Sequence, residues 1–155
     1  MVLSGGPAQR IGGYGLDEGV AREALQSILG LAILRVVLVC HVLTVFAQSV
    51  FAGQFLSGSD SPVKFHELTG WIVLLISAIQ ILLAAVLMRS AVTSLWLVLV
   101  SIFLFLCEGL QIGTGYGRVL NVHVPLGVII VAAVSCQTIS AFLKPARPAV
   151  PGNEV

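Results

Sequence analysis

Two histidines of this sequence open apolar stretches and carry the same companions at the same spacing. In each stretch a Gly follows the His after four residues and a Gln after fourteen: His66, Gly70 and Gln80, then His123, Gly127 and Gln137. A neutral imidazole is a common ligand of haem iron. Two imidazoles at matching positions of two helices predict one flat cofactor, a haem, held between them.

The composition indicates which elements position these histidines. Of the 155 residues, 57% are hydrophobic and 10% are charged, and the mean hydropathy is +1.04. A soluble domain has roughly 25% charged residues, so the expected solvent is a lipid bilayer. Apolar runs of about twenty residues can span it, and they lie at 36–56, 68–88, 92–111 and 122–143. The predicted fold is all-α, an integral membrane four-helix bundle.

The polar segments and basic residues predict the domains and the orientation. Residues 1–24 are expected to be a mostly disordered cytoplasmic tail with a short helix from Asp17 onward that leads into the first span. Residues 25–143 are the expected transmembrane domain and 144–155 a second cytoplasmic tail. Six basic residues lie on the side of the tails and two on the other, which predicts a multi-pass protein of the plasma or inner membrane with both termini in the cytoplasm. We call the helix ends near the two motif histidines the outer end. The formal net charge of +1 gives no basis for nucleic acid binding.

The motif extends to an internal repeat of two helical hairpins. Each hairpin has an ascending helix that ends in Gln and Gly, a loop, and a descending helix that opens with His. The matching residues are Gln48, Gly53, His66, Gly70 and Gln80 in the first hairpin and Gln111, Gly113, His123, Gly127 and Gln137 in the second. Because both hairpins run the same way, this predicts a parallel repeat about an axis along the membrane normal. It would place the two motif histidines at equal depth on opposite sides of the axis.

A haem b between the helices would use the residues of this repeat. His66 and His123 are the predicted axial, metal-binding ligands. A Gly near each His leaves room for a porphyrin edge or a neighbouring helix, and nearby Gln side chains can hydrogen-bond the imidazoles or face the propionates. The predicted cofactor-binding residues besides the histidines are Gly70, Gly127, Gly53, Gly113, Gln48 and Gln111. No catalytic residue is predicted.

A second polar layer is expected deeper in the membrane. Gln80 and Gln137 lie about 21 Å along their helices from the motif histidines, at 1.5 Å per residue, and His41 falls at a similar depth. Such a layer could bind a quinone head group or relay protons; a single His there does not support a second bis-His haem. The alternatives are interhelical hydrogen bonds for the glutamines and for His41. Glu108 is expected either near the water boundary or paired with a His.

The motif residues resemble one half of the heme A synthase family and, more loosely, other bis-histidine membrane cytochromes b. In that family each half is a four-helix bundle whose second and fourth helices open with paired histidines on the outer side, as His66 and His123 do here. The resemblance covers residues 36–143 and implies a haem pocket. The family's catalytic acid, three residues before its first His, is replaced by Val63, which weakens the case for oxidation chemistry. The chain is also similar to small four-helix bacterial membrane proteins with a Gln, Ala-Gly and His-x-x-x-Gly pattern.

Three functions are consistent with these residues. The first is a haem b-binding membrane protein that transfers electrons or anchors a redox complex, acting with another membrane or redox subunit and not as an enzyme on its own. The second is a non-redox membrane scaffold or accessory subunit whose histidines are structural. The third is an enzyme or transporter that uses His41, Glu108 and the glutamine layer, with a quinone near His41, Gln80 and Gln137 as one ligand.

Overall fold

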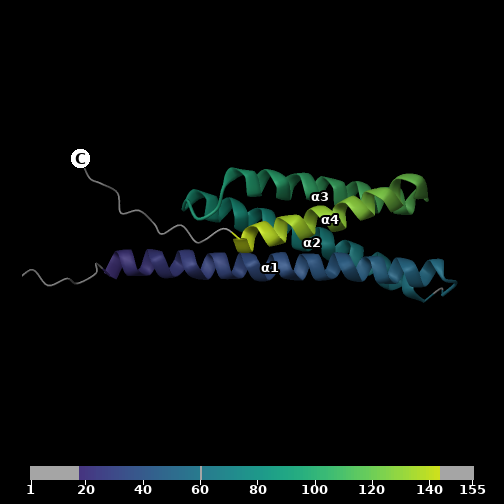
Figure 1. The fold of residues 1–155 in the computed structure, drawn as a ribbon, viewed down its shortest axis with the longest axis horizontal. Helices are drawn as coiled ribbons and strands as arrows, with labels where there is room; N and C mark the ends of the chain where they lie inside the picture. The colour runs from purple at the N-terminus through teal and green to yellow at the C-terminus, as the bar shows by residue number, and fades with distance from the viewer. Residues whose placement is uncertain (1–17, 60, 144–155) are drawn as a thin grey trace, which may run out of the picture.

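All regular structure that the computed structural model describes, over residues 18–59 and 61–143, is helical. The helices are α1 (Glu18–Leu56), α2 (Pro62–Arg89), α3 (Leu95–Tyr116) and α4 (Leu120–Leu143) (Figure 1). Each is long and apolar enough to cross a membrane. The prediction of an all-α chain with four helices of membrane-spanning length is confirmed.

Each helix packs against two others. α1 contacts α2 and α4, and α3 contacts the same two helices. Within the described ranges no backbone contact joins α1 to α3 or α2 to α4, so the members of these two pairs are diagonal to each other. The helices that carry the two motif histidines, α2 and α4, are therefore diagonal.

Helix α1 is much longer than the others. Its 39 residues correspond to about 58 Å at 1.5 Å per residue, and its N-terminal part extends past the other helices (Figure 1). Residues 18–24 are thus helical, and the predicted boundary at residue 25 falls inside α1. Good helix formers such as Ala21 and Glu23 favour this early start, and Glu18 in the first turn complements the helix dipole. The remaining parts of the predicted tails, 1–17 and 144–155, lie outside the described residues.

Residues 114–117 are Gly-rich and were expected to form the loop of the second hairpin, but 114–116 are helical. α3 continues to Tyr116, beyond the predicted end at residue 111, so Gly113 and Gly115 lie in its last turn. The hydroxyl of Thr114 donates to two carbonyl groups of the preceding turn, each at 3.0 Å. In lipid a chain must satisfy its backbone groups internally, and this requirement outweighs the low helix propensity of glycine.

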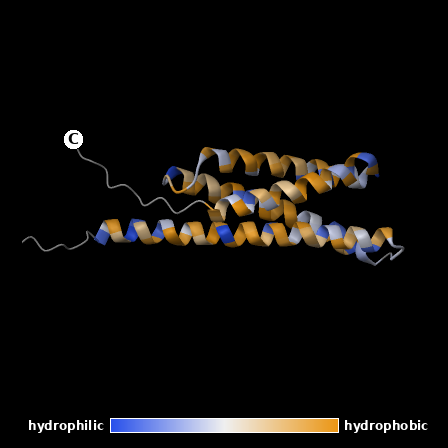
Figure 2. Cartoon of the chain, in the orientation of Figure 1, coloured by the Kyte–Doolittle hydropathy of each residue, from blue (hydrophilic) through white to orange (hydrophobic). Residues whose placement is uncertain are grey.

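Residues of high hydropathy make up most of every helix (Figure 2), and many of their large apolar side chains are exposed. Leu75, Phe103 and Ile129, from three different helices, are each at least 60% exposed. A helix that is hydrophobic all round suits a lipid environment. These side chains are the lipid-facing surface of the spans.

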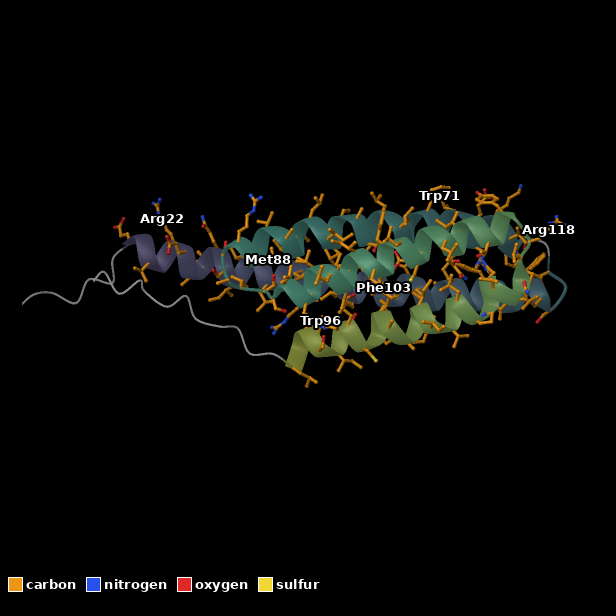
Figure 3. All side chains as sticks on the ribbon, turned by 90° about the horizontal axis from the view of Figure 1, so that it is seen from above. Arg22, Trp71, Met88, Trp96, Phe103 and Arg118 are labelled. Atoms are coloured by element: carbon orange, nitrogen blue, oxygen red, sulfur yellow. The ribbon has the colours of Figure 1, made fainter. Side chains whose placement is uncertain are left out.

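Polar and apolar layers alternate in the interior. Below the motif histidines lies an apolar cluster of Val45, Val73, Leu104, Ile130 and Val134, and a second apolar cluster near the inner end consists of Leu34, Leu38, Leu87 and Ala141. A buried polar network lies between the two clusters. Trp71 and Arg118 lie toward the outer end of the molecule and Arg22 toward the inner end (Figure 3).

Candidate functional site

The two motif histidines meet inside the outer end. The ring centroids of His66 and His123 are 6.0 Å apart, and the ring planes are inclined by 68°. Both residues are half-buried. Because α2 and α4 have no backbone contact, the rings reach toward each other across the interior. The expectation that the two rings face each other is met, and their role as ligands stays a prediction.

Each ring is held by the same kind of hydrogen bond to a neighbouring helix. Nδ1 of His66 lies 3.2 Å from the carbonyl oxygen of Gln48 on α1, and Nδ1 of His123 lies 2.9 Å from that of Gln111 on α3. A carbonyl oxygen can only accept, so Nδ1 carries the proton in both rings and donates it. In the neutral ring Nε2 then keeps its lone pair. Both histidines therefore have the tautomer that binds a metal through Nε2.

The glutamines hold the imidazoles through their backbone and not through their amides. The Nε2 of Gln48 donates to the carbonyl oxygen of His66 at 2.9 Å and to the hydroxyl of Thr69 at 2.5 Å. The Oε1 of Gln111 is buried without a hydrogen-bond partner among the described residues. The sequence correctly predicted that Gln48 and Gln111 contact the rings. It could not predict that the contact is made by their backbone carbonyl groups, because any residue type has one.

Of the predicted glycines, Gly127 makes room for a glutamine. A Cβ on Gly127 would lie 2.9 Å from Nε2 of Gln111, whereas a Cβ on Gly70 would lie 3.6 Å from Nε2 of Gln48, an ordinary contact distance. At Gly127, space for a neighbouring helix is therefore the expected role that is seen. A Cβ on Gly53 or Gly113 would meet no atom within 4 Å, and both residues are exposed, so their predicted place beside the rings is wrong: they lie on the outer surface of α1 and α3.

Gly115 belongs to the site and was missed by the sequence reasoning. A Cβ there would lie 3.0 Å from Cε1 and 3.2 Å from Nδ1 of His123, so the ring lies directly against the α3 backbone. A signal existed in the sequence. Gly115 follows Gln111 by four residues, and another small residue, Ala52, follows Gln48 by four.

A group of polar side chains on the outer surface was also missed. The hydroxyl of Tyr116 donates to Oε1 of Glu67 at 2.5 Å, and Nε1 of Trp71 donates to the same hydroxyl at 3.4 Å. These bonds join the end of α3 to the start of α2. All three residues are exposed, and none of them recurs in the repeat, so no pattern pointed to them.

The deeper polar layer is a closed hydrogen-bond network. Nδ1 of His41 donates to Oε1 of Gln80 at 2.9 Å. The amide of Gln80 donates to Ser101 at 2.9 Å and to Oε1 of Gln137 at 3.0 Å, and the amide of Gln137 donates to Ser101 at 2.9 Å. Ser101 in turn donates to the carbonyl oxygen of Leu97 at 2.8 Å. The level predicted for His41, Gln80 and Gln137 is thereby confirmed, and the network links all four helices.

Glu108 is buried in the interior, which excludes its predicted position near the water boundary. The residue is 3% exposed, and its Oε1 lies 3.0 Å from Nε2 of the fully buried His41. The two atoms are within ion-pair distance but out of line for a hydrogen bond, and neither Oε1 nor Oε2 has a hydrogen-bond partner among the described residues. The other expectation, pairing with a His, is the one that the structure shows. The physical reason is the high energy of an unpaired carboxylate in lipid.

The three residues predicted to bind a quinone are buried and hydrogen-bonded to one another. His41 and Gln80 are 0% exposed and Gln137 is 5% exposed. A quinone head group would have to break the bonds that these side chains make with each other. A quinone at this layer stays a prediction.

Among the described residues, no group of three or more His, Cys, Asp or Glu side chains is arranged to hold a metal ion. No family model, no curated protein and no solved structure matches this chain. The two polar layers, one around His66 and His123 and one around His41 and Gln80, are the features of the structure that indicate a function.

Proposed function

We propose that the chain is a haem b-binding multi-pass membrane protein in which His66 and His123 are the axial ligands. Its role would be electron transfer, or anchoring of a redox complex through a partner subunit in the membrane. One observation carries the proposal. Two imidazoles from diagonal helices approach to 6.0 Å between centroids, and each has its Nδ1 bound to a backbone carbonyl.

The distance between the rings suits a shared metal ion. Imidazole nitrogen binds a metal at about 2.0–2.1 Å, so two such bonds and two ring radii place the centroids on the order of 6 Å apart. The Nδ1–H bonds to carbonyl groups are the interactions that commonly orient ligating imidazoles and raise their basicity. The donor set and its tautomers thus fit a bis-imidazole iron.

The glycines of the repeat differ in their position relative to the proposed cofactor. Gly70 and Gly127 lie one turn below the histidines, next to glutamine amides. Gly53 and Gly113 are exposed and would not contact a macrocycle between the histidines. When bound, haem would supply reversible one-electron chemistry with both axial positions taken by protein. The chain's own residues then hold the iron and exclude a substrate from it.

The proposed architecture is a four-helix bundle of two parallel-repeat hairpins. It is supported by inward positions of α2 and α4 that correspond at a single offset of 57 residues. The pairs are His66 and His123, Gly70 and Gly127, Val73 and Ile130, Gln80 and Gln137, and Ala84 and Ala141. The balance of basic residues supports cytoplasmic termini, so we place the haem near the outer face of the cell membrane.

An absorption spectrum tests the proposal. Purified in detergent from cells supplied with haem precursor, the protein is expected to show a Soret band and, after reduction, the sharp bands of a six-coordinate haem b. His66→Ala and His123→Ala each remove one axial ligand and should abolish or broaden these bands. Val124→Ala, an exposed neighbour of His123 that is 52% accessible, is the matched control and should keep them. Unchanged spectra in both histidine variants would refute the ligand assignment.

A non-redox scaffold is the second candidate. It is favoured by the hydrogen bond that each ring already makes to a carbonyl group, because such bonds also lock two helices together. If the histidines are structural, the purified protein has no Soret band, and His66→Ala lowers its thermal stability without any spectral change. The same preparation therefore separates the two functions.

A further inference from the structure

Three departures from the two-fold sequence pattern meet in one network. Inward positions of α1 and α3 correspond at an offset of 63 residues, which pairs Gln48 with Gln111. The same offset gives three unequal pairs of buried residues: Leu38 and Ser101, His41 and Leu104, and Val45 and Glu108. The polar member of each pair belongs to the network around Gln80. If these three polar residues had unrelated roles, there would be no reason for them to lie in one connected network. Their connection through Gln80 and His41 therefore indicates a shared role.

His41 and Glu108 form a buried acid–base pair. Nδ1 of His41 donates to Gln80, so the atom that faces Glu108 is Nε2, 3.0 Å from the carboxyl oxygen. One proton between these two groups gives either a neutral pair or an imidazolium with a carboxylate, and both have zero net charge. A net charge at this depth is expensive. The pair therefore stays neutral unless another charge appears nearby.

Next to the pair on its inner side, the described residues offer no acidic or basic group. On that side lie the amides of Gln80 and Gln137 and the hydroxyl of Ser101, bonded to one another. None of these groups titrates near neutral pH. Beyond these residues lies the inner apolar cluster.

The outer side of the pair offers a route. Glu108 Oε2 and Gln111 Oε1 are both buried acceptors without a hydrogen-bond partner in the described ranges. They are three residues apart on α3 and so lie on the same face of the helix. Buried acceptors of this kind are commonly satisfied by water molecules, which also carry protons. The backbone carbonyl of Gln111 in turn holds His123, so this face of α3 leads from Glu108 past the outer apolar cluster to the outer histidines.

We propose that His41 and Glu108 form a proton-binding site that takes up one proton from the outer side when an electron enters the outer histidine site. The proposal rests on the proposed haem function. A one-electron donor supplies the electron, and the outer aqueous phase supplies the proton. The proton converts the pair to an imidazolium with a carboxylic acid, so the combined charge of the two sites does not change. Oxidation reverses both transfers.

Among the described residues, the thiol of Cys107, adjacent to Glu108 on α3, is the other titratable group beside the pair. In the described part of the chain, α2 contributes Ser77 and Gln80 to the buried polar residues, and α4 contributes Gln137 and Thr138. On α3, the thiol of Cys107 packs against the outer apolar cluster. The coupled proton is therefore assigned to His41 and Glu108.

A redox titration over a range of pH, followed at the haem bands, tests the coupling. Uptake of one proton per electron changes the equilibrium tenfold per pH unit, which lowers the midpoint potential by about 59 mV per pH unit. In Glu108→Gln, an isosteric change that keeps a partner for His41, this slope should disappear. Glu67→Gln removes an exposed outer carboxylate and should keep the slope. Infrared difference spectra should show a carboxylic acid band on reduction of the wild type that Glu108→Gln lacks.

The possible outcomes separate this inference from the function on which it rests. A flat slope in the wild type, or a full slope in Glu108→Gln, would overturn the proton site and leave the haem site standing. A protein without a Soret band would overturn both. His41→Gln is a second variant that should also lose the slope, which guards against an effect peculiar to position 108.

Discussion

The outer histidine layer and the deeper network differ in how they use the two halves of the chain. In the outer layer each half supplies the same parts: a His on one helix and, on its neighbour, a Gln whose carbonyl oxygen accepts from that ring. In the deeper network only Gln80 and Gln137 correspond. His41 faces Glu108, and their respective counterparts are Leu104 and Val45, which belong to the apolar cluster between the layers.

The difference separates two kinds of site. An arrangement made twice from the same residues presents two equivalent ligands to a symmetrical object, such as an iron ion between two faces of a macrocycle. An acid beside a base is unequal by nature, and it can bind or release a proton. A duplicated scaffold can therefore hold a symmetrical cofactor at one depth and an asymmetric proton site at another.

The largest expected effect comes from restoring two-fold symmetry at the deeper layer. His41→Leu or Glu108→Val alone leaves one buried polar group without its partner and should destabilise the protein by about 3–5 kcal/mol. The double variant gives both helices Leu and Val at these positions. It leaves Oε1 of Gln80 without the donor that His41 supplied but no buried charge without its partner, so its loss should be smaller than the sum of the two single losses. Free energies of unfolding from SDS titration in mixed micelles give the coupling as a double-mutant cycle. Additive losses in the double variant would show that the two residues do not act as a pair.

A smaller effect is expected where the outer layer is not quite symmetrical. Gly115→Ala puts a Cβ 3.0 Å from the ring of His123, which should displace the ring at a cost of about 1–3 kcal/mol and alter the spectrum of bound haem. Gly113→Ala is the matched control, because its Cβ would meet no atom within 4 Å. The measurements are thermal stability and the position of the haem bands. Equal behaviour of the two variants would mean that the ring has freedom to move.

The sequence predicted the outer layer well because its residues recur. His66 and His123 share their spacing to Gly and Gln, and a shared register on two helices implies a shared depth. The hydrogen bonds from their rings could not be predicted, since the acceptors are backbone carbonyl groups. The position of Gly115 against a ring depends on how far α3 continues, and the run of glycines suggested a loop where lipid favours a helix.

The deeper layer was predicted only in part because it does not recur. Counting residues gave the common level of His41, Gln80 and Gln137, but depth alone does not say which way a side chain points. Glu108 lies three residues before Gln111, and this spacing places both on one helix face. Because Gln111 was expected to face the interior, the same spacing favours an inward carboxylate at position 108. Ser101 had no such signal, since its counterpart Leu38 is apolar.

The smallest effect is expected at the outer surface. There the hydrogen bond between Tyr116 and Glu67 joins the two hairpins, and neither residue recurs at the matching position of the repeat. Tyr116→Phe removes a hydrogen bond from an exposed side chain and should lower stability by no more than about 1 kcal/mol, because water replaces the lost partner. The haem bands and the pH slope of the midpoint potential should stay unchanged, since the bond joins α2 to α3 without touching either layer. Comparison with Glu67→Gln in the same unfolding titration tests whether the carboxylate is the partner, because the two variants should lose similar amounts. A Tyr116→Phe variant with altered haem bands would instead place this surface bond within the outer site and make the two halves of that site unequal.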